Sequence, residues 1–236
     1  MFKLLFVAMI VAMTVTWMLI RRFQERPWTE VGVIPGSHDP GGRASSPQQV
    51  GLWVFLGVVT SVFTVFIGAY FMRMDSAHGG VAAGQLATWM PVDEPRILWL
   101  NTLFLVLASI AIQLAHSNGG KISVAHTRRY FNAAGLLTML FLIGQGYAWQ
   151  QLYASGEYGP GSPAFSFFVL LTAVHGLHLI GGLYVWSRTA SRLRTGLEKA
   201  DLIEVGALRR SVQLCATYWH YLLLIWIVVF AIFLST

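Results

Sequence analysis

The sequence predicts an all-α membrane protein, a polytopic bundle of about six transmembrane helices. Apolar residues make up 56% of the chain and charged residues only 11%, against roughly 25% charged residues in a soluble domain. Backbone polar groups in lipid are satisfied most simply within a helix, and the sequence lacks the alternating pattern of barrel strands. Six apolar runs approach the ~20 residues that cross a bilayer. They lie near residues 4–20, 51–72, 97–115, 131–151, 164–187 and 213–234.

The first run is predicted to be a retained N-terminal transmembrane helix over residues 1–22. A signal peptide is the alternative, but the run is longer than the ~7–15 apolar residues of such a peptide, and Arg21 and Arg22 follow it. Prolines and glycines then predict a cytoplasmic linker over residues 23–49. Residues 50–236 contain the other five runs and are predicted to form one five-helix membrane domain.

Basic residues are distributed unevenly between the connections. Those after the first, third and fifth runs are Arg21, Arg22, Arg26, Arg43, Lys121, Arg128, Arg129, Arg188, Arg192, Arg194, Lys199, Arg209 and Arg210. Only Lys3, Arg73 and Arg96 lie on the other side. The positive-inside rule therefore places both termini outside the cytoplasm and accounts for the net charge of +6 without a nucleic-acid partner. The mixed charges of residues 188–211 also predict a helix at the membrane surface.

Small and aromatic residues in the runs predict how the helices pack. Glycines that allow close helix contacts are Gly57, Gly68, Gly135, Gly144, Gly146, Gly176, Gly181 and Gly182. Tryptophans near the predicted ends of the runs, or in the flanking loops, are Trp17, Trp53, Trp89, Trp99, Trp149, Trp186 and Trp219. The tryptophans are typical of an aromatic belt at the membrane interface. Both features are expected of ordinary membrane packing.

Three histidines are the ionisable groups predicted to lie within the membrane: His175, His178 and His220. They could bind copper or zinc, or a b-type haem, because imidazole is a common metal ligand. The interpretation we favour is that they are neutral and form hydrogen bonds between helices. No Asp or Glu falls in the middle of a run, which argues against proton conduction. The single cysteine, Cys215, excludes paired-thiolate metal sites within this chain.

Four motifs in order resemble subunit III of the haem–copper terminal oxidases. They are Trp53-Val-Phe-Leu56 through Gly68-Ala-Tyr70, Leu98-Trp-Leu-Asn-Thr102, Thr172-Ala-Val-His-Gly-Leu-His-Leu-Ile-Gly-Gly182, and Tyr218-Trp-His-Tyr221 followed by Trp226. Together they cover about residues 50–235. Their common order makes the resemblance more specific than any one motif would be.

The resemblance implies an accessory subunit III of a bacterial respiratory oxidase in the inner membrane. The complex would reduce oxygen to water and translocate protons, with cytochrome c as electron donor. The alternatives are a quinol oxidase, a relative associated with nitric oxide reductase, or a free-standing membrane haem or metal protein. Haems and copper would lie in partner subunits I and II, and this chain would carry no catalytic, cofactor or metal residue. Phospholipids are expected ligands, and the complex could join a larger respiratory supercomplex.

The resemblance also marks candidate residues and departures from the family. Candidates for structural and lipid contacts are Trp53, Asn101, His175, His178, Trp219 and His220. Many members carry a glutamate where this chain has Val59, and an acid where it has Leu223. Many members also have two helices before the five-helix block, whereas this sequence predicts one. A lipid-holding cleft would therefore be altered here or completed by a neighbouring subunit.

Overall fold

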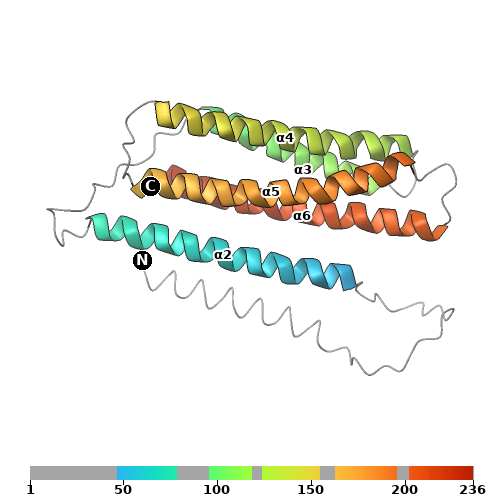
Figure 1. The fold of residues 1–236 in the computed structure, drawn as a ribbon, viewed down its shortest axis with the longest axis horizontal. Coiled ribbons are helices and arrows are strands. Elements are labelled where there is room, and N and C mark those ends of the chain that lie inside the picture. The colour runs from blue at the N-terminus through green and yellow to red at the C-terminus, as the bar shows by residue number, and fades with distance from the viewer. Residues whose placement is uncertain (1–46, 79–95, 119–123, 155–162, 196–201, 236) are drawn as a thin grey trace, which may run out of the picture. The chain divides into compact units, whose positions relative to one another are not determined.

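The computed structural model describes residues 47–78, 96–118, 124–154, 163–195 and 202–235, and these form five long α-helices (Figure 1). The helices are α2 (Pro47–His78), α3 (Ile97–Asn118), α4 (Val124–Ala154), α5 (Pro163–Thr195) and α6 (Leu202–Ser235). The described residues contain no strand, so the all-α prediction is confirmed. The predicted N-terminal helix, and the predicted linker up to residue 46, lie outside the described residues.

Each of the five helices is long and apolar enough to span a membrane. The candidate spans contain 29, 21, 30, 32 and 30 residues, and at about 1.5 Å per residue each exceeds the roughly 30 Å hydrocarbon core. Proline begins both α2 and α5, where its missing N–H costs no helical hydrogen bond. The chain is therefore a multi-pass membrane protein.

The helices extend beyond the apolar runs that predicted them. Instead of a separate surface helix over residues 188–211, the structure continues α5 to Thr195 and starts α6 at Leu202. Ala190 and Leu193 remain buried near the end of α5, because apolar positions at helical spacing continue its packed face. The predicted surface helix is thus made of the ends of two spanning helices.

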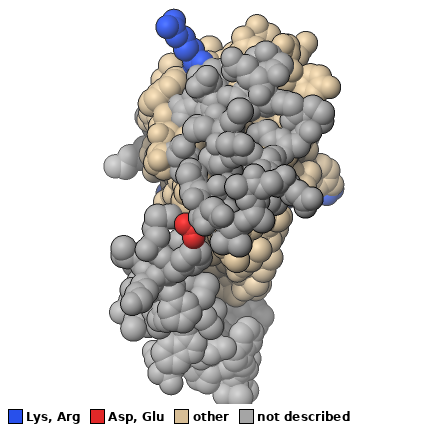
Figure 2. Space-filling view, turned by 90° about the vertical axis from the view of Figure 1, so that its left-hand side faces the viewer, with Lys and Arg blue, Asp and Glu red and all other residues tan. Residues whose placement is uncertain are grey.

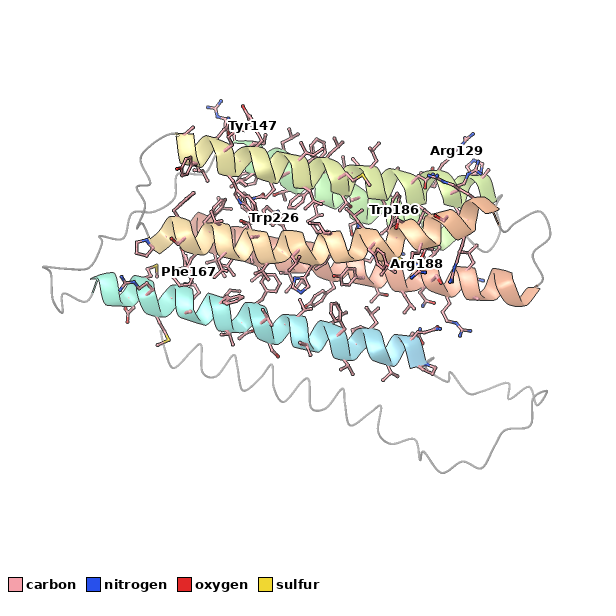
Figure 3. All side chains as sticks on the ribbon, viewed as in Figure 1. Arg129, Tyr147, Phe167, Trp186, Arg188 and Trp226 are labelled. Atoms are coloured by element: carbon pink, nitrogen blue, oxygen red, sulfur yellow. The ribbon has the colours of Figure 1, made fainter. Side chains whose placement is uncertain are left out.

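The chain consists of two compact units, Met1–Gly57 and Val58–Thr236. In the first, the described residues are the opening turns of α2. In the second, α3 packs on α4 and α6, and α5 packs on α4 and α6, so these four helices form a closed bundle (Figure 1). Basic side chains gather at one end of it: Arg129 of α4 and Arg188 of α5 lie at the end opposite Tyr147 and Phe167 (Figure 3). In the end-on view of Figure 2 most of the described surface has neither basic nor acidic side chains.

Aromatic side chains fill the centre of the bundle. Trp226 is 1% exposed and meets Phe141 edge to face, with ring centroids 4.8 Å apart. Such pairs contribute about 0.5–1.5 kcal/mol beyond area burial in soluble proteins. In a bilayer close packing matters still more, because lipid tails are as apolar as the core and provide no hydrophobic driving force between helices.

Three of the predicted glycine contacts are present in the structure. A β-carbon added there would collide with a neighbouring helix, and the pairs are Gly135 with Trp186, Gly144 with Asn101, and Gly182 with Tyr218. At Gly176 the same atom would make only an ordinary contact with Leu142, at 3.6 Å. At Gly68, Gly146 and Gly181 it would meet no described atom within 4 Å. Close approach therefore explains only some of the glycines.

Candidate functional site: polar contacts between the helices

Hydrogen bonds between tryptophan and threonine side chains, which we call indole–threonine clasps, join the helices inside the bundle. An indole N–H donates to a threonine hydroxyl on another helix in three places: Trp226 to Thr102 at 2.9 Å, Trp219 to Thr138 at 2.9 Å, and Trp149 to Thr172 at 3.0 Å. These bonds join α6 to α3, α6 to α4, and α4 to α5. Two of the four contacts that close the bundle, α3–α6 and α4–α5, thus carry a hydrogen bond, and the third bond crosses the bundle from α6 to α4.

The threonine hydroxyl of each clasp is held in position by a hydrogen bond to its own helix. Its hydroxyl donates to the carbonyl oxygen four residues earlier: Thr102 to Leu98, Thr138 to Ala134, and Thr172 to Phe168. The hydroxyl hydrogen is then used within the helix, and the oxygen lone pairs remain for the indole. Each buried polar group in the clasp therefore has a partner, which the bilayer could not supply.

His175 is fully buried among aromatic rings. Its ring centroid lies 5.6 Å from that of Phe141 and 5.2 Å from that of Trp226. Its Nε2 lies 3.2 Å from the carbonyl oxygen of Leu222 on α6. A carbonyl oxygen only accepts, so Nε2 carries a hydrogen and donates it to Leu222. Among the described residues, Nδ1 has no hydrogen-bond partner.

His178 lies three residues further along α5 but meets a different helix. Its Nδ1 donates to the Val174 carbonyl of its own helix at 2.7 Å. Its ring centroid lies 5.8 Å from that of Phe63 on α2. The hydroxyl of Tyr218 on α6 donates to the His178 carbonyl at 2.9 Å. The two imidazole rings thus have separate neighbours: the ring of His175 lies between α4 and α6, and the ring of His178 lies beside Phe63 of α2.

His220 links α6 to α3. Its Nε2 lies 2.9 Å from Gln113 Oε1, and its Nδ1 lies 2.5 Å from Ser109 Oγ. Because an amide oxygen accepts, Nε2 donates to Gln113 and Nδ1 accepts from the Ser109 hydroxyl. The side chains of His220 and Gln113 are exposed on the bundle surface, whereas Ser109 is buried.

The remaining candidate residues show a mixture of packing and exposure. Asn101 is fully buried, and its Nδ2 lies 3.5 Å from Gln145 Oε1. Trp219 is 1% exposed near the middle of its span, so its predicted place in an interfacial belt is wrong. Trp53 is 51% exposed in the opening turns of α2. Val59, where many family members have an acid, is 2% exposed.

No three His, Cys, Asp or Glu side chains come together as a metal-binding group within the described residues. His175, His178 and His220 instead have oxygen partners on a neighbouring or their own helix. The indole–threonine clasps were missed from the sequence. The signal that could have found them is threonine on the buried face of an apolar run, because such a hydroxyl needs a partner in lipid.

The comparisons with known proteins give a consistent family. No protein-family model matches the chain. A "Probable cytochrome c oxidase subunit 3" of Mycobacterium tuberculosis is 30% identical over 187 residues, which cover 78% of this chain and 85% of the relative. A "Cytochrome c oxidase subunit 3" of Bacillus sp. is 25% identical over 183 residues, covering 78% and 83%. A "Cytochrome bo(3) ubiquinol oxidase subunit 3" of Buchnera aphidicola is 23% identical over 188 residues, covering 79% and 90%.

Proposed function

The chain belongs to the cytochrome c oxidase subunit 3 family, and we propose that it is the non-catalytic subunit III of a bacterial cytochrome c oxidase. Family membership makes it an accessory subunit of a haem–copper oxidase. The proposal adds that the complex reduces oxygen to water and translocates protons, while this chain stabilises subunit I and holds phospholipids. The observation that carries it is the match at 30% identity over 78% of the chain.

The polar interior supports a structural rather than a conducting role. The polar contacts inside the bundle are made by indoles, hydroxyls, amides and imidazoles rather than by carboxylates. Within the described helices the acidic residues are Asp75 and Glu204, and both lie near a helix end. Proton paths through membranes use intramembrane carboxylates as relays. We therefore place the haems, the copper and the proton path in subunits I and II.

A stabilising role follows from how the bundle is built. The clasps join three helix pairs, so the bundle presents a rigid body to whatever lies beside it. Many large apolar side chains remain exposed, among them Ile143 at 69% and Leu177 at 66%. Such surfaces would be covered by lipid tails or by helices of a partner. A rigid neighbour restricts local opening of the helices that it covers.

Cytochrome c is the donor we propose, with quinol as the second candidate. The Mycobacterium and Bacillus relatives are named cytochrome c oxidase subunits, whereas the Buchnera relative is named a ubiquinol oxidase subunit. Oxygen uptake by the purified complex with reduced cytochrome c, and separately with ubiquinol, distinguishes the two. Nitric oxide consumption under the same conditions tests the third alternative.

The location that we propose is the bacterial inner membrane, with both termini outside the cytoplasm. Arg129 and Arg188 lie at the same end of the bundle (Figure 3). This supports the orientation, because the ends of membrane helices that are rich in arginine stay in the cytoplasm.

The test removes the subunit from its complex. A tag on this chain should bring down haem-containing partners in mild detergent. Stripping the chain should then leave the haem spectrum and the initial oxygen uptake nearly intact, while activity decays faster over many turnovers. A mock-treated complex is the control, and adding the chain back should restore the slow decay. Immediate total loss of activity with an altered haem spectrum would contradict the proposal.

A further inference from the structure

Three hydrogen-bonded side chains connect the core of the bundle to its outer surface. Ser109 is buried at 4% exposure, and it bonds to His220, which bonds to Gln113. His220 and Gln113 are exposed. His175, by contrast, is fully buried inside the bundle. The His220–Gln113 pair is therefore a polar surface feature rather than part of the core.

This surface feature lies at the depth of the lipid tails. Counting from Gly206, His220 is residue 15 of the 30-residue α6 span. Gln113 lies six residues past Leu107, the middle of the span Ile97–Ser117, or about 9 Å along the helix. The hydrocarbon core extends about 15 Å to each side of its centre. Both residues therefore lie within the hydrocarbon core, His220 near its middle and Gln113 about 6 Å from its edge.

Acyl chains cannot accept hydrogen bonds from the Gln113 amide at that depth. The Gln113 oxygen is used by His220, and its amide nitrogen, with two N–H groups, has no partner among the described residues. An N–H left unpaired in hydrocarbon is costly. Polar side chains at membrane depth accordingly face other helices or a water-filled cavity.

The polar surface continues along α6 and differs from the other exposed faces. Gln213 is exposed and Thr217 is half-buried, and both share the stripe of His220 at spacings of four and three residues. The outward face of α4 carries exposed Leu136 and Ile143 instead, at 59% and 69%. Lipid tails suit that face, but they do not suit the α6 stripe.

We propose that the α3–α6 polar face, formed by Gln113, Gln213, Thr217 and His220, docks against a transmembrane helix of a neighbouring oxidase subunit. That helix would offer an oxygen acceptor, such as a carboxylate, amide or hydroxyl group, to the Gln113 amide. The argument is chemical complementarity: an unpaired donor within the hydrocarbon core needs an acceptor that lipid tails lack. This inference rests on the proposed function, because it takes the partner from the same complex.

The first experiment is site-specific photo-cross-linking in the purified complex. A photoreactive amino acid replaces Thr217 on the polar face or Ile143 on the α4 control face. We expect irradiation to join the chain to a haem-containing subunit from position 217 and to give no protein product from position 143. A product from position 143 alone, a dimer of this chain, or an internal product with residues 1–46 would each overturn the proposal. If no haem protein co-purifies with the unmodified chain, the proposed function fails instead.

A second experiment measures the polar contact itself. Gln113→Leu should raise the fraction of the chain lost from the complex during detergent washing by about threefold, the effect of one typical membrane hydrogen bond. Ile143→Leu is the matched control and should change nothing. The heat stability of the isolated chain is compared in parallel, to separate loss of docking from loss of folding. Equal retention of Gln113→Leu and the unchanged chain would contradict docking through this residue.

Discussion

Replacing Gly182 by alanine should loosen the contact between α5 and α6, whereas the same change at its neighbour Gly181 should not. A β-carbon at Gly182 would lie 2.7 Å from Tyr218 Cε1 and 3.4 Å from Trp219 Cη2. At Gly181 it would meet no described atom within 4 Å. The two positions share a helix, a depth and a residue type, so the pair isolates the steric effect.

The magnitude follows from that distance. Carbon atoms prefer separations of about 3.5–4.0 Å, so the Tyr218 ring would have to retreat by about 1 Å. It cannot swing away freely, because its hydroxyl is bonded to the His178 carbonyl at 2.9 Å. Overpacking of this kind costs about 1–3 kcal/mol, and the better helix propensity of alanine returns at most ~1 kcal/mol. Taking the middle of that cost, we expect a net loss of about 1 kcal/mol for Gly182→Ala, a factor of roughly 5 in the folded-to-unfolded ratio.

The assay is an SDS titration of the chain in mixed micelles, followed by tryptophan fluorescence. Gly182→Ala should unfold at a lower SDS fraction, and Gly181→Ala should unfold at the original fraction or slightly above it. A double-mutant cycle with Tyr218→Ala should return a coupling energy that accounts for most of the loss. Equal midpoints for the two alanine variants would refute the close contact between Gly182 and Tyr218.

Two further predictions concern topology and the paired histidines. With buried Cys215 as the only background thiol, cysteines at positions 125 and 195 should resist an impermeant thiol reagent in intact cells. A cysteine at position 158 should react, and the reverse pattern would overturn the orientation derived from the basic residues. Replacing His175 and His178 together by glutamine should leave the metal content per haem of the complex unchanged, because both imidazoles bond to carbonyl oxygens. Loss of one metal per complex in elemental analysis would show that they are ligands.

The fold could be predicted from the sequence because lipid imposes two strong constraints, length and apolarity, on every spanning helix. The five apolar runs after residue 50 all became helices in the expected order. The ends of the helices were harder to predict, because an apolar run marks only the part of a helix that lies inside the lipid. The last run was expected to begin at residue 213, but α6 begins at Leu202. The burial of Trp219 at 1% exposure could not be predicted from the run either, because it depends on how α6 packs on its neighbours.

The polar contacts were harder to predict than the residues that make them. His175, His178 and His220 stood out because imidazoles are rare in apolar runs, yet their spacing says nothing about their partners. The i, i+3 pair on α5 illustrates this: His175 meets Leu222 on α6, whereas His178 lies beside Phe63 of α2. Which groups meet depends on the rotation of each helix against its neighbours, and a single sequence does not contain that information.

The departures from the family pattern bear on how this subunit acts. Val59 is buried at 2% exposure at a place where many members carry a glutamate, so the helix position is kept but its charge is not. A buried carboxylate would need a partner for its charge, and its protonation would couple packing to pH. An aliphatic side chain has neither requirement. With indole–threonine clasps in place of ionisable pairs, the helix contacts of this bundle depend on shape and neutral hydrogen bonds. A bundle of this kind supports neighbouring subunits because its helices stay packed. We therefore expect it to affect how long the oxidase stays active during turnover rather than the rate of the first turnovers.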